Sequence, residues 1–141
     1  MRTRRLIVAL AALLALAVPV RAQSVRIGQL NGANFNSTAD QAIQIPFGRY
    51  VIRRITVQNC STSLTLAVGG FYTAASKGGT AIVANTQVYT ALTSATKFFD
   101  VTPAAILTTD VLTAPTVYLS LTTGQGSAAT CNVAIFGDIL D

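Results

Sequence analysis

After residue 22, the chain is a succession of short runs rich in Val, Ile, Leu, Thr and Tyr, separated by Gly, Asn, Ser and Pro. Several runs alternate apolar and polar residues, as a strand with one buried face does, and none has the periodicity of an amphipathic helix. Short strands with turn residues between them are typical of antiparallel sandwiches and barrels. We therefore predict an all-β domain, an antiparallel β-sandwich of the jelly-roll or immunoglobulin-like kind.

The expected strand boundaries follow from the turn residues. Asn31-Gly32 predicts a tight turn after the first strand, because Asn and Gly tolerate the positive φ that such turns need. Pro46 ends a short second strand, and Gly69-Gly70 is expected to end another. The predicted strands cover residues 24–30, 42–45, 49–58, 63–68, 80–84, 87–92, 97–101, 116–123 and 131–136.

The run 49–58 shows the alternation most clearly. Val51, Ile55 and Val57 fall on one face of the predicted strand, which we expect to be buried. Arg53 falls on the same face, so we expect it near a strand end or edge, with its charged tip in water.

The segment before the domain has a different character. Residues 1–5 carry three arginines and no acid, residues 6–18 form an unbroken apolar run, and Pro19 follows. A basic start and an apolar stretch too short to span a bilayer are typical of a secretory signal peptide. We predict that residues 1–22 are cleaved and that 23–141 form one exported domain without a transmembrane segment. Its location would be the periplasm, the cell surface or the medium.

Removing the signal peptide lowers the net charge of the chain. Four of the ten basic residues leave with it, so six basic residues remain against five acids, a net charge of +1. A nucleic-acid binder needs a dense field of Lys and Arg to displace phosphate counterions, so this composition argues against that class. Copies of a chain with low net charge repel one another only weakly, so a second copy is one partner that we consider. The other is a cell-surface component.

Cys60 and Cys131 are the two cysteines of the chain. In an oxidising compartment, an even pair of cysteines indicates a disulfide. The bond would close a loop of about 70 residues, for which the chain-entropy model gives about 4 kcal/mol. We predict this disulfide, with free thiols as the alternative. A metal or redox site is disfavoured because the chain has no Cys-x-x-Cys pair and no histidine.

The sequence lacks the side chains that most enzymes use to move protons. It has no histidine and no glutamate, which excludes Ser-His and Cys-His nucleophilic catalysis. The five aspartates are scattered among turn segments, so a hydrolase built on aspartates alone is a minor alternative. We therefore expect a non-enzymatic protein with no cofactor and no metal site.

Two groups of residues are candidates for binding. Exposed tyrosines on a β face can stack on sugar rings, and the candidates here are Tyr72, Tyr89 and Tyr118. Glycine-rich loops let a backbone approach a partner closely, and the candidates in the stretch 69–80 are Gly69, Gly70, Phe71, Lys77, Gly78 and Gly79. The alternative interpretations are cross-strand packing for the tyrosines and an ordinary turn for the glycine-rich stretch.

The run 69–84, the segment 118–122 and the closing Phe136-Gly137-Asp138 resemble small uncharacterised bacterial and phage-associated β-sandwich proteins, over about half of the mature chain. The resemblance implies a virion-type or surface accessory domain without enzymatic activity. The predicted signal peptide departs from it, because virion components assemble in the cytoplasm. We predict an exported structural or interaction protein capable of self-association. The alternative is a secreted glycan- or small-ligand-binding module that uses the tyrosines.

Overall fold

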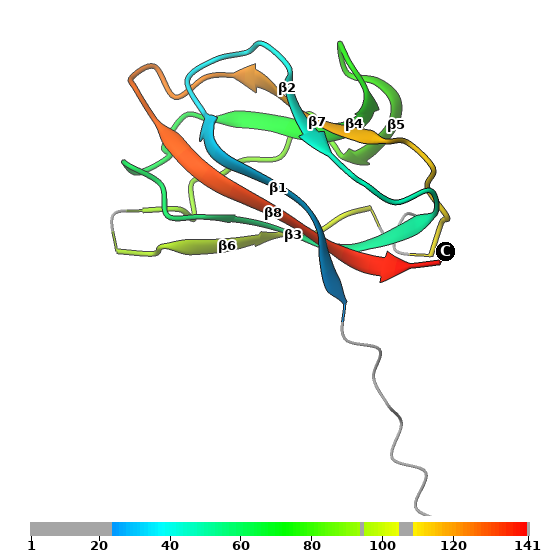
Figure 1. The fold of residues 1–141 in the computed structure, drawn as a ribbon. Helices are drawn as coiled ribbons and strands as arrows, with labels where there is room; N and C mark the ends of the chain where they lie inside the picture. The colour runs from blue at the N-terminus through cyan, green and yellow to red at the C-terminus, as the bar shows by residue number, and fades with distance from the viewer. Residues whose placement is uncertain (1–23, 94, 105–108, 141) are drawn as a thin grey trace, which may run out of the picture.

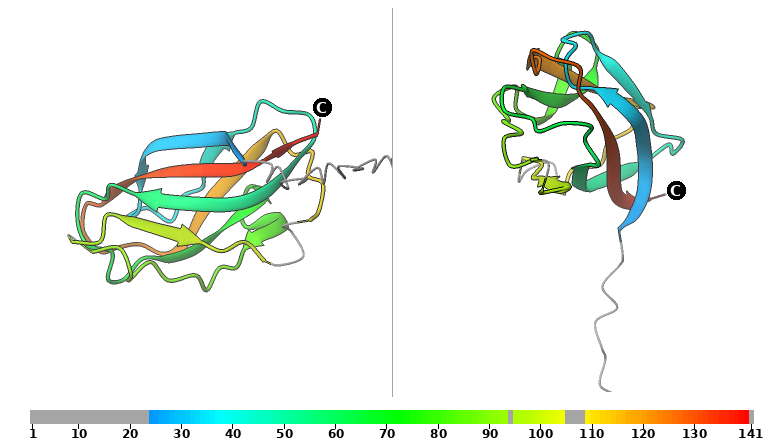
Figure 2. Two further views of the ribbon diagram at one scale, coloured as in Figure 1. Left: turned by 90° about the horizontal axis from the view of Figure 1, so that it is seen from below. Right: turned by 90° about the vertical axis from the view of Figure 1, so that its left-hand side faces the viewer.

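The structure, a computed structural model, describes residues 24–140 except residue 94 and residues 105–108, and the predicted signal peptide lies outside the described residues. Eight strands form two antiparallel sheets of four strands that pack face to face (Figure 1 and Figure 2). The prediction of an antiparallel β-sandwich is confirmed. In the described part of the chain, no helix long and apolar enough to cross a bilayer is present.

The strands are divided between the sheets in a fixed order. Sheet A consists, from edge to edge, of β1 (Val25–Asn34), β8 (Thr130–Ile139), β3 (Tyr50–Gln58) and β6 (Phe98–Val101). Sheet B consists of β2 (Gln41–Gln44), β7 (Thr116–Thr123), β4 (Val68–Ala74) and β5 (Gly78–Val83).

The pairing of the strands is nested. β1 pairs with β8, β2 with β7, β3 with β6 and β4 with β5. The first strand in sequence thus pairs with the last, the second with the second last, and so on to the middle of the chain. The pairs β3–β8 and β4–β7 then join these ribbons into two sheets. This nested pairing is that of a jelly roll, which is one of the two kinds of sandwich predicted from the sequence.

The apolar core lies between the two sheets. β7 and β8 show the predicted alternation, because every second side chain is fully buried against the opposite sheet. The buried residues of these two strands are Val117, Leu119 and Leu121 in β7, and Cys131, Val133 and Ile135 in β8.

Val51, Ile55 and Val57 are all buried, as predicted, but Val51 does not share a face with the other two, because the strand contains a bulge at Arg53. Ile52 and Arg54 pair with consecutive residues of β8, so Arg53 is an extra residue. A bulge shifts the alternation of side chains by one position. Ile52 is therefore part of the core and Val51 is not. Arg53 is exposed and forms an ion pair of 2.6 Å with Asp138.

Asn31-Gly32 does not end the first strand. β1 runs through it to Asn34, and the register against β8 shifts between Leu30 and Ala33. Gly32 has the expected positive φ of 67°, but this conformation forms an irregularity within the strand instead of a hairpin turn.

Two segments predicted as strands, 63–68 and 87–92, are loops apart from isolated bridges and the first residue of β4. Gln125 explains the first of them. Its side-chain oxygen accepts hydrogen bonds from the backbone N–H groups of Leu66 and Ala67, at 3.0 and 3.3 Å, in place of a neighbouring strand. Leu66, in this loop, is 58% exposed.

Candidate functional site

The three tyrosines predicted to bind a ligand do not form one exposed surface. Tyr72 and Tyr118 lie opposite each other on adjacent strands of sheet B, but Tyr72 is 4% exposed and Tyr118 is half-buried. Tyr89 is fully buried between the sheets, where its ring meets that of Phe35 edge-on at 5.1 Å. Its hydroxyl donates to the carbonyl oxygen of Gly69 at 3.1 Å. These contacts give Tyr89 a role in packing.

The glycine-rich stretch predicted as an interaction loop is a β-hairpin. Its first half belongs to β4, where Gly69, Gly70 and Phe71 are buried. Gly70 is required for close packing inside the hairpin, because a Cβ atom there would lie 2.1 Å from the carbonyl oxygen of Val83. Its second half is at the surface, where Lys77, Gly78 and Gly79 form the tip and the start of β5. The structure therefore separates the two halves of this candidate site.

Asp40 attaches the hairpin tip to the rest of sheet B. Its carboxylate accepts hydrogen bonds from the Ser120 hydroxyl and from the backbone N–H of Ser76. These bonds, with the nearby charge of Lys77, lower the pKa of Asp40 below its ordinary value. Ser76 and Lys77 both have positive φ, so the carboxylate supports a turn with an unfavourable backbone conformation.

The predicted disulfide between Cys60 and Cys131 is confirmed. Cys60 follows the end of β3, Cys131 is the second residue of β8, and their Cα atoms are 4.1 Å apart. The bond thus joins two strands that are neighbours in sheet A but 71 residues apart in sequence.

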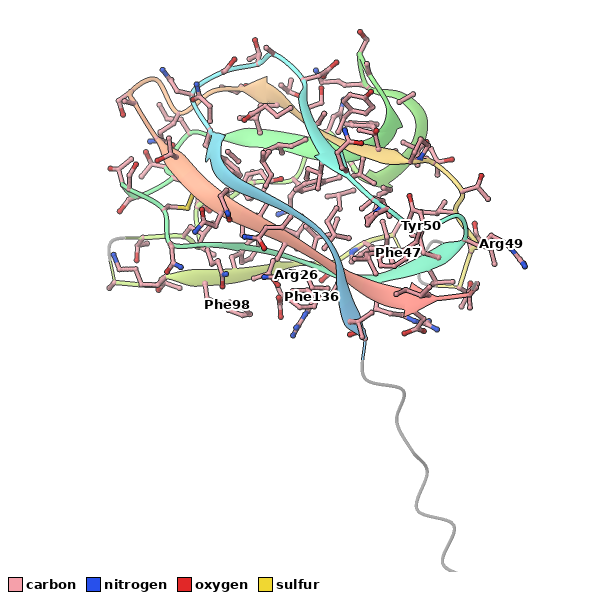
Figure 3. All side chains as sticks on the ribbon, in the orientation of Figure 1. Arg26, Phe47, Arg49, Tyr50, Phe98 and Phe136 are labelled. Carbon is pink, nitrogen blue, oxygen red and sulfur yellow. A yellow bond between two sulfur atoms is a disulfide. The ribbon has the colours of Figure 1, made fainter. Side chains whose placement is uncertain are left out.

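The outward face of sheet A holds a different set of side chains, which we call the arginine face. A row of three runs across three strands, because Arg26 in β1 and Arg54 in β3 both pair with Phe136 in β8. Adjacent strands are about 4.8 Å apart, so the row spans about 10 Å. The arginine face consists of Arg26, Phe136, Arg54, Thr56, Asp100 and Phe98. Figure 3 shows Arg26, Phe136 and Phe98 on the side of sheet A away from sheet B.

The Arg54 guanidinium lies over the Phe136 ring, with its central carbon 4.6 Å from the ring centroid. This is a cation–π contact. Asp100 is close by, but its Oδ1 is 3.8 Å from Arg54 Nε and accepts a hydrogen bond of 2.9 Å from the Thr56 hydroxyl. An exposed ion pair of this length contributes little to stability. The ring contact therefore orients Arg54, and the N–H groups of its guanidinium are not taken up by a short ion pair.

Positive charge is concentrated around this face. Five basic residues lie on the strands of sheet A or directly before them, against two aspartates, which gives +3. The remaining described residues carry Lys77 against Asp40 and Asp110, which gives −1. The basic residues of sheet A are Arg26, Arg49, Arg53, Arg54 and Lys97, and its acids are Asp100 and Asp138. Such an asymmetry attracts anionic partners to one side of the molecule.

Sequence reasoning did not find this face. The neighbours of Arg54 depend on strand order, which the sequence does not reveal. The Arg53-Arg54 doublet was the available signal, since two arginines in one strand are unusual in a chain so poor in charge. In the part of the chain that the structure describes, no group of acidic or thiol side chains is arranged to hold a metal ion.

Comparisons with known proteins add nothing to this geometry. No protein-family model, curated protein or solved structure matches the chain. The resemblance to bacterial and phage-associated β proteins thus stays a prediction, and the candidate site rests on its own chemistry.

Two buried tyrosines predict how the fold responds to high pH. Tyr50 is fully buried, donates a hydrogen bond of 2.6 Å to the Ala114 carbonyl oxygen, and has its pKa raised to about 12 by burial. Burial also raises the pKa of Tyr89. Because the folded state favours the neutral phenol, their contribution to stability is complete below pH 10 and is lost as the pH rises toward 12.

We therefore expect the protein to unfold in this alkaline range, with tyrosinate absorbance and the loss of β circular dichroism rising together. In Tyr50→Phe, one tyrosine fewer should ionise in this alkaline range. Ionisation of all four tyrosines near pH 10 in a protein that stays folded would contradict the prediction.

Proposed function

We propose that this chain is an exported, non-enzymatic interaction protein that binds an acidic polysaccharide through the arginine face. The observation that carries the proposal is the row Arg26–Phe136–Arg54, which lies on the sheet with a net positive charge. The jelly-roll fold itself assigns no function, because one fold hosts many activities.

The chemistry of the row suits a charged sugar polymer. A guanidinium is planar and binds a carboxylate or sulfate group through two parallel hydrogen bonds. The Phe136 ring between the two arginines holds the Arg54 guanidinium over its face. Phe98, 49% exposed at the end of the same face, offers an apolar surface to the C–H groups of a sugar ring. Alternating charged and apolar contacts match a polymer in which anionic groups recur along a carbohydrate backbone.

The disulfide supports the exported part of the proposal. Disulfides persist in oxidising compartments outside the cytoplasm, and the Cys60–Cys131 bond joins the central strands of sheet A. This agrees with the signal peptide predicted for residues 1–22. Acidic polysaccharides are abundant in the same compartments, at the surface of cells.

The strand edges argue against the self-association that was predicted from the sequence. The edge strands β2 and β6 are four residues long, and the long edge strand β1 carries two register irregularities. Short or bulged edges resist pairing with another copy, and two arginine faces repel each other. We expect light scattering after size exclusion to give the mass of a monomer. An oligomer dissociated by substitutions in the arginine face would contradict the proposal.

The arginine face is tested with oligogalacturonate and, for comparison, neutral dextran. Arg26→Ala and Arg54→Ala are each expected to weaken oligogalacturonate binding about tenfold, because a charge-assisted hydrogen-bond pair is lost. Lys77→Gln, which removes one positive charge from sheet B, is the matched control and should leave affinity unchanged.

Calorimetry measures these affinities, and the melting temperature of each variant checks its fold. Equal binding of dextran, or full affinity in the double arginine variant, would refute the proposal. Binding to vesicles containing anionic lipid but to no polysaccharide would replace it with a membrane-surface role.

A further inference from the structure

A groove of about 290 Å³ opens beside the arginine face, where β1 passes the connection between β2 and β3. Arg26 belongs to both surfaces, so the groove continues the face around the edge of sheet A. The residues that line the groove, which we call the β1–β2 groove, are Arg26, Ile27, Gly28, Gln29, Gln44, Pro46 and Phe47.

Gly28 forms the floor of the groove and allows β1 to approach β2. A Cβ atom at this position would lie 2.5 Å from Ile45 Cδ1 and 3.2 Å from Ile43 Cγ2. The glycine thus lets the two sheets meet at this corner without a side chain filling the space. The lining of the depression comes from both strands and from the loop that follows β2.

The walls of the groove combine one cation, two amides and one ring. Gln29 and Gln44 are exposed. The Gln29 amide nitrogen donates a hydrogen bond to the side chain of Asn31, and each amide has further donor and acceptor capacity for hydroxyl groups. The Gln44 oxygen is 3.4 Å from the Thr116 hydroxyl, a weak bond that a ligand can displace. Phe47 is half-buried and packs against the core, so its ring is held in place. Figure 3 shows it near Tyr50.

We infer that the β1–β2 groove is the subsite for one uronic-acid residue of the polysaccharide, an inference that rests on the proposed function. Arg26 binds the carboxylate, Gln29 and Gln44 bind ring hydroxyls, and Phe47 contacts the sugar C–H groups. A single cation in the groove matches a single carboxylate, and the neutral amides match free hydroxyls. A sugar with sulfate groups in place of those hydroxyls would leave the additional charges without cations.

The experiment compares oligogalacturonate, its methyl ester and dextran sulfate as ligands in calorimetry. The double variant Gln29→Ala with Gln44→Ala is expected to bind oligogalacturonate about tenfold more weakly, because two hydrogen bonds to hydroxyls are lost. Its affinity for dextran sulfate should not change. The methyl ester, which has no carboxylate charge, should bind the wild type at least tenfold more weakly than the acid.

Gln87→Ala is the matched control, because it removes an amide that lies on a loop beside β4, outside the groove. Gln29→Glu with Gln44→Glu is a second variant, which keeps the size of both side chains and should repel the carboxylate. Because all three substituted positions are exposed or half-buried, melting temperatures near that of the wild type are expected.

The outcomes separate the subsite from the proposed function. If oligogalacturonate binds with full affinity to both glutamine variants but depends on Arg26 and Arg54, the subsite is refuted and the arginine face stands. Equal losses for oligogalacturonate and dextran sulfate in the alanine variant would also refute it. If neither polyanion binds the wild type, both proposals fail.

Discussion

Replacing Cys60 and Cys131 together with alanine is expected to lower the free energy of unfolding by about 4 kcal/mol, because the disulfide closes a loop of about 70 residues in the unfolded chain. For a domain of this size, the melting temperature should fall by about 15 °C. Urea denaturation followed by circular dichroism measures the change, and a higher m-value in the variant would show that its unfolded chain is less compact.

Reduction of the wild-type protein provides the control for this result. A reducing agent should bring the wild type to the stability of the double alanine variant and leave that variant unaffected. Equal unfolding midpoints for oxidised and reduced wild type would show that the bond contributes nothing to stability.

Tyr89→Ala is expected to cost about 4 kcal/mol, because it empties a fully buried aromatic position between the sheets. The substitution removes ring contacts with Phe35 and Phe99, whose centroids lie 5.1 and 6.3 Å away. Tyr89→Phe keeps the ring and loses only the hydrogen bond to the Gly69 carbonyl, so it should cost about 1 kcal/mol. Chemical denaturation of the three proteins measures both differences.

The same pair of variants tests whether Tyr89 takes part in binding. Since its side chain has no exposed surface, Tyr89→Phe should bind oligogalacturonate with the affinity of the wild type. A loss of affinity in Tyr89→Phe without a loss of stability would show that this residue takes part in binding.

Features that depend on neighbours in sequence could be predicted. Alternation in β7 and β8 identified their buried faces, and the pairing of Cys60 with Cys131 followed from there being two cysteines. Features that depend on partners distant in sequence could not. The bulge at Arg53 exists only in relation to β8. The segment before β4 reads as a strand, but Gln125, about 60 residues later, supplies its hydrogen bonds.

The candidate site shows the same limit. Arg26, Arg54 and Phe136 become neighbours only because β8 is inserted between β1 and β3. Each is unremarkable in its own segment, and no spacing within the sequence relates them. Tyr89 shows the same limit, because the segment 87–92 was predicted as a strand with Tyr89 as a candidate for exposed stacking, whereas it is a loop that buries this ring.

The nested pairing of the strands also sets the order in which the protein can fold. β8 is the last strand in sequence and lies between β1 and β3. Sheet A therefore cannot join β1 to β3 by hydrogen bonds until β8 has taken its place between them. Folds dominated by such non-local pairs fold slowly. A chain that leaves a membrane channel with its first residues leading would stay unfolded until nearly the whole domain has crossed.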